Sequence, residues 1–108
     1  MLIVRGVNVF PQLIERTLLS IEDIEPHYQI VIDRPKNQLD TVEILVEAAA
    51  HLFQPVQTER LEALRRKVEH ELAQTLGVSV GVKLMGPKTV QRSEGKAKRV
   101  IDRREMSL

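Results

Sequence analysis

"HYQIVIDRPKNQLDTVEILVE", residues 27–47, contains two alternating segments separated by a polar turn. Apolar and polar side chains alternate through residues 27–33 and again through residues 41–47, which is the pattern of half-buried β-strands. Between them, residues 34–38 are Arg-Pro-Lys-Asn-Gln, a cluster of types that favour turns. We therefore expect a β-hairpin with a longish loop at the centre of the fold.

The stretch that follows the hairpin predicts a long amphipathic helix over residues 57–76. Its apolar residues recur at spacings of three and four, which places them on one helical face. They are Leu61, Leu64, Val68, Leu72 and Leu76. Gly77 stands where a helix C-cap is expected. The carboxylates of this stretch have basic neighbours three or four residues away, so we interpret them as a solvated charged face. They are Glu59, Glu62, Glu69 and Glu71.

The chain before the hairpin predicts a strand, a turn and a helix. Residues 2–4 are Leu-Ile-Val, a short apolar run, and Gly6-Val7-Asn8 has turn-forming residues at both ends. Pro11 suits the first position of a helix, which we expect over residues 11–20. The chain starts in this strand without a polar lead-in, and we interpret that as a cut from something upstream.

The chain after the long helix predicts one more strand and a basic tail. Residues 78–84 alternate again, Gly86-Pro87 ends the alternation, and residues 99–104 favour a short strand or turn. The order is β-α-β-β-α-β. We expect an α+β sandwich: a mainly antiparallel sheet of about three or four strands covered by two helices, with a basic C-terminal loop or tail.

Composition restricts the classes of function. The 108 residues suit one domain, and the net charge of +1 gives no overall attraction to nucleic acid or membranes. The chain has no cysteine, which excludes disulfides and thiolate chemistry and fits a cytoplasmic location. No apolar run approaches the ~18 residues of a membrane span, and we see no signal peptide. The three histidines, at 27, 51 and 70, have no metal-ligand spacing, so we expect no metal site.

The basic run "RSEGKAKRVIDRR", residues 92–104, has two interpretations: a tail that binds nucleic acid, or a loop that brings one lysine to an anionic reaction centre. Aromatic residues that could stack on bases are absent from it, which disfavours the first. Taken alone, the small sheet is also compatible with a regulatory or dimerisation domain. A stand-alone binding module therefore stays open as an alternative.

Two motifs in this chain resemble the C-terminal motifs of the adenylate-forming superfamily, which includes acyl- and aryl-CoA synthetases. Residues 6–15, GVNVFPQLIE, are similar to the family's G-x-x-I-x-P-x-E-I-E, and residues 92–99, RSEGKAKR, to its R-T/S-x-G-K-I-x-R. The amino-acid sequences of both motifs are most similar to those of the phenylacetate-CoA ligase branch. The chain departs from the general pattern at Ile3, Leu13 and Ala97, and the last two fit that branch.

The resemblance implies a role for each motif in two-step activation of a carboxylic acid. It implies that Lys96 is the adenylation lysine, with Gly95, Arg92 and Ser93 supporting the loop around the nucleotide. It also implies that Gly6, Val7, Asn8 and Arg5 line the channel for coenzyme A. No metal ligand is implied in this chain.

The same resemblance implies that residues 1–108 form one C-terminal lid domain, and that the large N-terminal domain is absent from this chain. ATP, coenzyme A and Mg²⁺ would serve the full-length enzyme, and this domain alone would bind none of them and be inactive. The implied partners are the N-terminal adenylation domain and an aryl acid such as phenylacetate, with no nucleic acid or membrane. Other aryl acids, the related cofactor-adenylating ligases and a homo-oligomer stay open.

Overall fold

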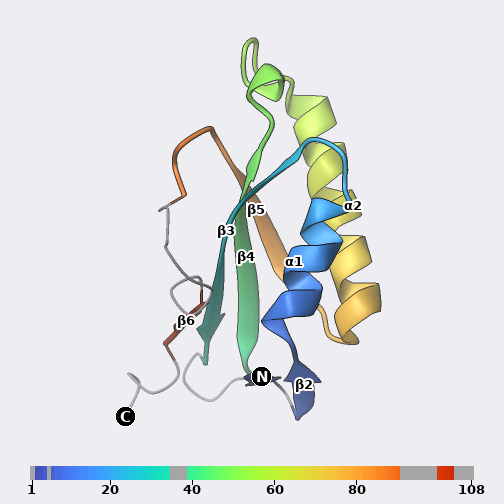
Figure 1. Ribbon diagram of the computed structural model, residues 1–108, viewed down its shortest axis with the longest axis vertical. Coiled ribbons are helices and arrows are strands. Elements are labelled where there is room, and N and C mark those ends of the chain that lie inside the picture. The colour runs from blue at the N-terminus through green and yellow to red at the C-terminus, as the bar shows by residue number, and fades with distance from the viewer. Residues whose placement is uncertain (1, 5, 35–38, 91–99, 104–108) are drawn as a thin grey trace.

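The computed structural model describes residues 2–4, 6–34, 39–90 and 100–103. Two helices lie together on one side of a twisted sheet (Figure 1). The elements are β1 (Leu2–Val4), β2 (Val7–Val9), α1 (Pro11–Leu19), β3 (Ile24–Asp33), β4 (Thr41–Ala48), the short 3₁₀ helix η1 (Ala50–Leu52), α2 (Thr58–Leu76), β5 (Gly81–Met85) and β6 (Val100–Asp102). The expected α+β class and its two helices are confirmed.

The main sheet has four strands in the order β5-β4-β3-β6. Strands β3 and β4 form the expected antiparallel hairpin, in which Ile30 faces Ile44. In contrast, β5 is parallel to β4, and β6 is parallel to β3. The sheet is therefore mixed, whereas we expected it to be mainly antiparallel. The reason lies in the connection: α2 carries the chain back along the sheet, so β5 starts from the same end as β4.

The N-terminal segment forms a second, two-stranded sheet that the sequence did not predict. We expected a turn at Gly6-Val7-Asn8, but Val7 and Asn8 belong to β2, which pairs antiparallel with β1. Of these three residues, Gly6 alone lies in the turn. The pairing is favoured because it lets both Val4 and Val9, each 1% exposed, enter the core.

The core lies between the helices and the sheet. The helices contribute Ile14, Leu18, Val68 and Leu72, and the central strands contribute residues such as Ile30 and Ile44; all are at most 1% exposed. Burial of each such side chain stabilises the fold by roughly 1.5–3 kcal/mol. Helix α2 ends as expected at Gly77, whose left-handed backbone has φ 78° and whose N–H donates to the carbonyl of Ala73.

Within the described ranges, neither helix has a stretch long and apolar enough to cross a membrane. The longer one, α2, carries charged residues along its outer faces.

Candidate functional site

The first predicted motif begins at the turn between β1 and β2. Leu2 pairs with Val9, Ile3 with Asn8, and Val4 with Val7. Because side chains alternate along a strand, Ile3 and Asn8 lie on the opposite face from Val4 and Val9. Ile3 is 53% exposed and Asn8 is exposed too, whereas Val7 is half-buried. The hairpin is therefore held to the core by its valines and presents its other face outward.

Gly6 occupies the exposed turn of this hairpin with φ 78°, a conformation that L side chains rarely adopt. A Cβ added at Gly6 would meet no atom within 4 Å. Glycine is thus required by the backbone and not by crowding within this domain. Arg5, the other residue predicted for this region, lies outside the described residues.

Helix α1 starts directly after the hairpin. Pro11 is its first residue, as predicted, and the carbonyl of Phe10 accepts a hydrogen bond from Leu13 N–H at 2.9 Å. Phe10 itself is 43% exposed. Ile14 and Leu18 then enter the core, so the hairpin and the helix form one continuous packed unit.

The second predicted motif, with Arg92, Ser93, Gly95 and Lys96, lies outside the described residues. The structure describes what precedes and follows it. Residues up to Val90 come before it, and β6 comes after it and pairs with β3. Arg103, just past β6, donates its N–H to the carbonyl of Ile32 at 2.7 Å. Figure 1 shows β6 and the β1–β2 hairpin in the same half of the molecule along its longest axis.

A buried carboxylate holds the chain just before the second motif. Glu47, on β4, is 2% exposed, and its oxygens accept hydrogen bonds from the N–H groups of Lys88 at 2.9 Å and Val90 at 3.0 Å. Lys88 has φ 61°, unusual for a residue with a side chain. The sequence did not single out Glu47, because in the alternating pattern it is indistinguishable from the exposed Glu43.

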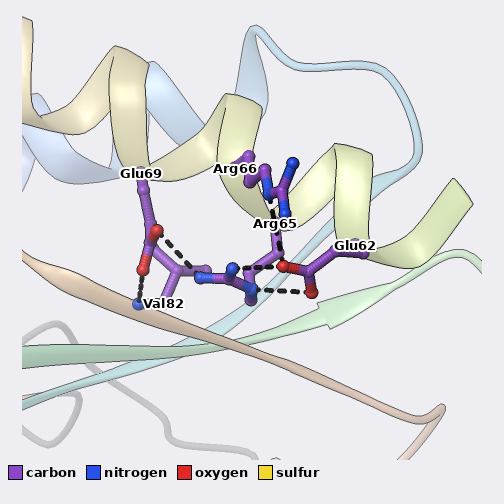
Figure 2. A network of polar contacts seen from close by, with 5 residues as sticks. All are labelled: Glu62, Arg65, Arg66, Glu69 and Val82. Atoms are coloured by element: carbon purple, nitrogen blue, oxygen red, sulfur yellow. Dashed lines mark hydrogen bonds and ion pairs between the residues drawn. The ribbon is translucent and has the colours of Figure 1, made fainter. Parts of the chain in front are cut away.

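A second polar network joins α2 to β5 (Figure 2). Arg65 donates from Nε to Glu62 at 3.1 Å and forms an ion pair with Glu69 at 2.8 Å. Hydrogen bonding to Arg65 lowers the pKa of Glu62 below its usual range, and the same contact raises the pKa of Arg65. The predicted pairing of carboxylates with basic neighbours is confirmed here, although Glu69 also contacts the sheet.

Next to this network lies an open depression of about 360 Å³ between the start of α2 and β5. Its apolar lining includes Val56, Leu61 and Leu84, and its charged lining is Glu62, Arg65 and the exposed Lys83. Glu62 and Arg65 bind each other, and no described residue that lines the depression belongs to either predicted motif. We therefore do not regard it as the functional site.

The three histidines belong to three different elements, β3, η1 and α2. His27 is half-buried on β3, His70 is exposed on α2, and His51 lies 3.5 Å from a carboxylate oxygen of Asp23. Among the residues that the structure describes, no group of three or more His, Cys, Asp or Glu side chains could hold a metal ion.

The sequence of this chain matches the family model described as "AMP-binding enzyme C-terminal domain" over residues 6–104. Phenylacetate-coenzyme A ligase of Thermus thermophilus is 39% identical over 97% of the chain, and that of Escherichia coli K12 is 34% identical over 98%. The matches cover 26% and 24% of those proteins. The chain thus spans about a quarter of the length of the curated relatives it matches.

Solved structures agree with this match. A domain of phenylacetate-coenzyme A ligase from Bacteroides vulgatus superposes with a TM-score of 0.83 at 30% identity, covering 96% of this chain and 92% of that one. A 2-hydroxyisobutyryl-CoA ligase in complex with 2-HIB-AMP and CoA, in the thioesterification state, superposes with a TM-score of 0.87 at 31% identity, covering 97% of this chain and 21% of that one. This chain belongs to the family of C-terminal domains of AMP-binding enzymes.

Proposed function

We propose that this chain is the C-terminal lid domain of an ATP-dependent aryl-acid:CoA ligase, and specifically of a phenylacetate-CoA ligase. One observation carries the proposal: residues 6–104 match the family model, a range that contains both stretches that resemble the motifs, residues 6–15 and 92–99. The names of the curated relatives support the choice of phenylacetate.

In the first step, a carboxylate oxygen of the acid attacks the α-phosphorus of ATP, and pyrophosphate leaves. Two anions approach each other, and negative charge increases on the phosphoryl oxygens. A lysine ammonium within hydrogen-bond reach stabilises that charge. We assign this role to Lys96, which supplies a compact positive charge with three donors.

We assign supporting roles to the residues around Lys96. Gly95 would let the loop backbone pass close to the nucleotide, because it has no side chain. Arg92 and Ser93 would supply donors next to the phosphates.

In the second step, the thiol sulfur of coenzyme A attacks the acyl carbon, the thioester forms and AMP leaves. We propose that the β1–β2 turn then faces the reaction centre. Gly6 and Asn8 are exposed there, and the space around Gly6 is open, which suits a passage for a thin pantetheine chain. Val7 would contribute through its backbone, and Arg5 through a contact with a phosphate.

The remaining parts of the reaction belong to the proposed N-terminal adenylation domain. That domain would hold ATP, the aryl acid and Mg²⁺, and it would select the acid. The C-terminal domain would rotate between the two steps to present first the loop with Lys96 and then the β1–β2 turn. We expect the 108-residue chain alone to be inactive.

The test uses the full-length enzyme and measures its two half-reactions separately. Lys96→Ala should abolish ATP-dependent formation of the acyl-adenylate but largely spare thioester formation from supplied acyl-adenylate. Lys83→Ala removes an exposed lysine on β5 and serves as the matched control, with both steps unchanged. Adenylation that survives in Lys96→Ala would contradict the assignment.

A second pair of variants tests the turn. Gly6→Ala and Gly6→Leu both impose a side chain on the same left-handed backbone, so they share its strain and differ only in bulk. Gly6→Leu should slow thioester formation much more than Gly6→Ala does. The rate of adenylation should be similar in the two variants. Equal losses in the two variants would point to backbone strain and against a channel at Gly6.

A further inference from the structure

Glu47 lies on the face of the sheet opposite the helices. On β4, Val42, Ile44 and Val46 belong to the core, so the alternating residues Glu43 and Glu47 point to the other face. Glu43 is exposed there, but Glu47 is 2% exposed because the chain after β5 covers it.

Burial of a carboxylate is unfavourable unless its oxygens accept hydrogen bonds. Glu47 meets this requirement with the N–H groups of Lys88 and Val90, at 2.9 and 3.0 Å, one on each oxygen. The two N–H groups both point at the Glu47 carboxylate because the chain turns between them. Lys88 adopts φ 61°, and the N–H of Thr89 donates a hydrogen bond to the carbonyl of Gly86. Val90 is 4% exposed, so the end of this turn is packed against the protein.

The turn held by Glu47 is the last described segment before residues 91–99, which contain the second motif. The first described segment after them is β6, whose Val100 pairs with Ile30 of β3. Strands β3 and β4 are neighbours in the sheet. The described segments on both sides of the motif are thus attached to the β3–β4 hairpin, and on the side of Val90 the carboxylate of Glu47 supplies hydrogen bonds for this attachment.

We infer that Glu47 is a positioning residue for the adenylation step: its carboxylate holds the turn from which the segment with Lys96 starts. The inference rests on the proposed function and adds a residue that neither motif contains. A carboxylate is suited to the role because it only accepts, whereas a carboxamide places an NH₂ group against one of the two N–H donors. A displacement of about 1 Å at a reacting group can reduce the rate on the order of 100-fold.

The experiment compares Glu47→Gln, Glu47→Asp and the control Glu43→Gln in the full-length enzyme, with the two half-reactions measured separately. Glu47→Gln keeps the length and Glu47→Asp keeps the charge but is one methylene shorter. Both should slow adenylation by at least about tenfold through kcat while thioester formation from supplied acyl-adenylate stays within about twofold. Glu43→Gln should leave both steps within about twofold. Amide hydrogen exchange of Lys88 and Val90 should accelerate in both Glu47 variants, while that of Ile44 stays unchanged.

The comparison of the two half-reactions separates positioning from general damage to the fold. A loss of positioning at Lys96 slows adenylation alone, whereas a damaged fold slows both half-reactions. Equal losses in both half-reactions, or no loss in either, would overturn the role of Glu47. Failure of the proposed function looks different: the wild-type enzyme would form no acyl-adenylate, or Lys96→Ala would retain it.

Discussion

The Glu69 carboxylate on α2 accepts a hydrogen bond from the backbone N–H of Val82 on β5, with 3.0 Å between Oε2 and N. Strand β5 is at the edge of the sheet, where backbone groups lack a neighbouring strand. The other oxygen of Glu69 pairs with Arg65 at 2.8 Å, so the helix both covers the edge strand and binds its backbone (Figure 2).

Glu69→Ala should lower the free energy of unfolding of this chain by about 1 kcal/mol, because it removes one hydrogen bond and one partly exposed ion pair. Urea denaturation measures the change. Glu71→Ala, on the same helix, is the matched control, since in the described part of the chain the side chain of Glu71 makes no hydrogen bond or ion pair. Equal effects of the two variants would show that the bond to Val82 contributes nothing.

The stability of the chain should depend on pH through Glu62. Its pKa is lowered in the folded state by the hydrogen bond from Arg65, so the stabilisation is present above the ordinary pKa of glutamate and is lost as pH falls through the lowered value. The Tm of Glu62→Gln should therefore be lower than that of the wild type at pH 7, and the difference in Tm should shrink as the pH is lowered. A difference that is constant with pH would contradict this origin.

Gly77→Ala should destabilise the chain by about 1 kcal/mol, because alanine is strained at the left-handed C-cap of α2. A Cβ there would meet no atom within 4 Å, so the cost comes from the backbone alone. The control is Gly81→Ala on β5, where a Cβ would make an ordinary contact of 3.8 Å and φ is not positive. Denaturation should show little loss for Gly81→Ala, and a comparable loss there would argue against the conformational explanation.

Leu72→Ala should cost about 2–5 kcal/mol, because Leu72 is completely buried between α2 and the sheet and its removal leaves a cavity. Leu64 lies on the same stripe but is only partly buried. Leu64→Ala should therefore cost clearly less by the same measurement. The reverse order would mean that the core is centred nearer the start of α2 than the structure places it.

Local patterns in the sequence predicted most of the elements. The alternation in residues 27–47 predicted β3 and β4, and the leucine spacing with Gly77 predicted α2 and its end. These predictions succeeded because the spacing of apolar residues in a strand or a helix depends only on residues that are close in the chain. The start of β5 was placed three residues early, since Val78 alternates with its neighbours although the strand begins only at Gly81.

Pairing between distant segments was less predictable. Nothing in residues 2–9 showed that Val7 would pair with Val4, which turned an expected loop into a hairpin. Likewise, the alternation of residues 78–84 is the same for a parallel and an antiparallel partner, so the mixed sheet was not evident. Both outcomes depend on which arrangement buries the apolar residues of the whole chain.

Local patterns in the chain established the periodicity of the elements, the capping residues and the two motifs that indicated the family. Which of two similar carboxylates on β4 is buried became clear from the packing of distant segments. Glu43 and Glu47 have the same place in the alternating pattern, yet the turn at Lys88 and Val90 covers only Glu47. The physical reason is that alternation assigns a side chain to a face of the sheet, whereas burial depends on the distant segment that packs on that face.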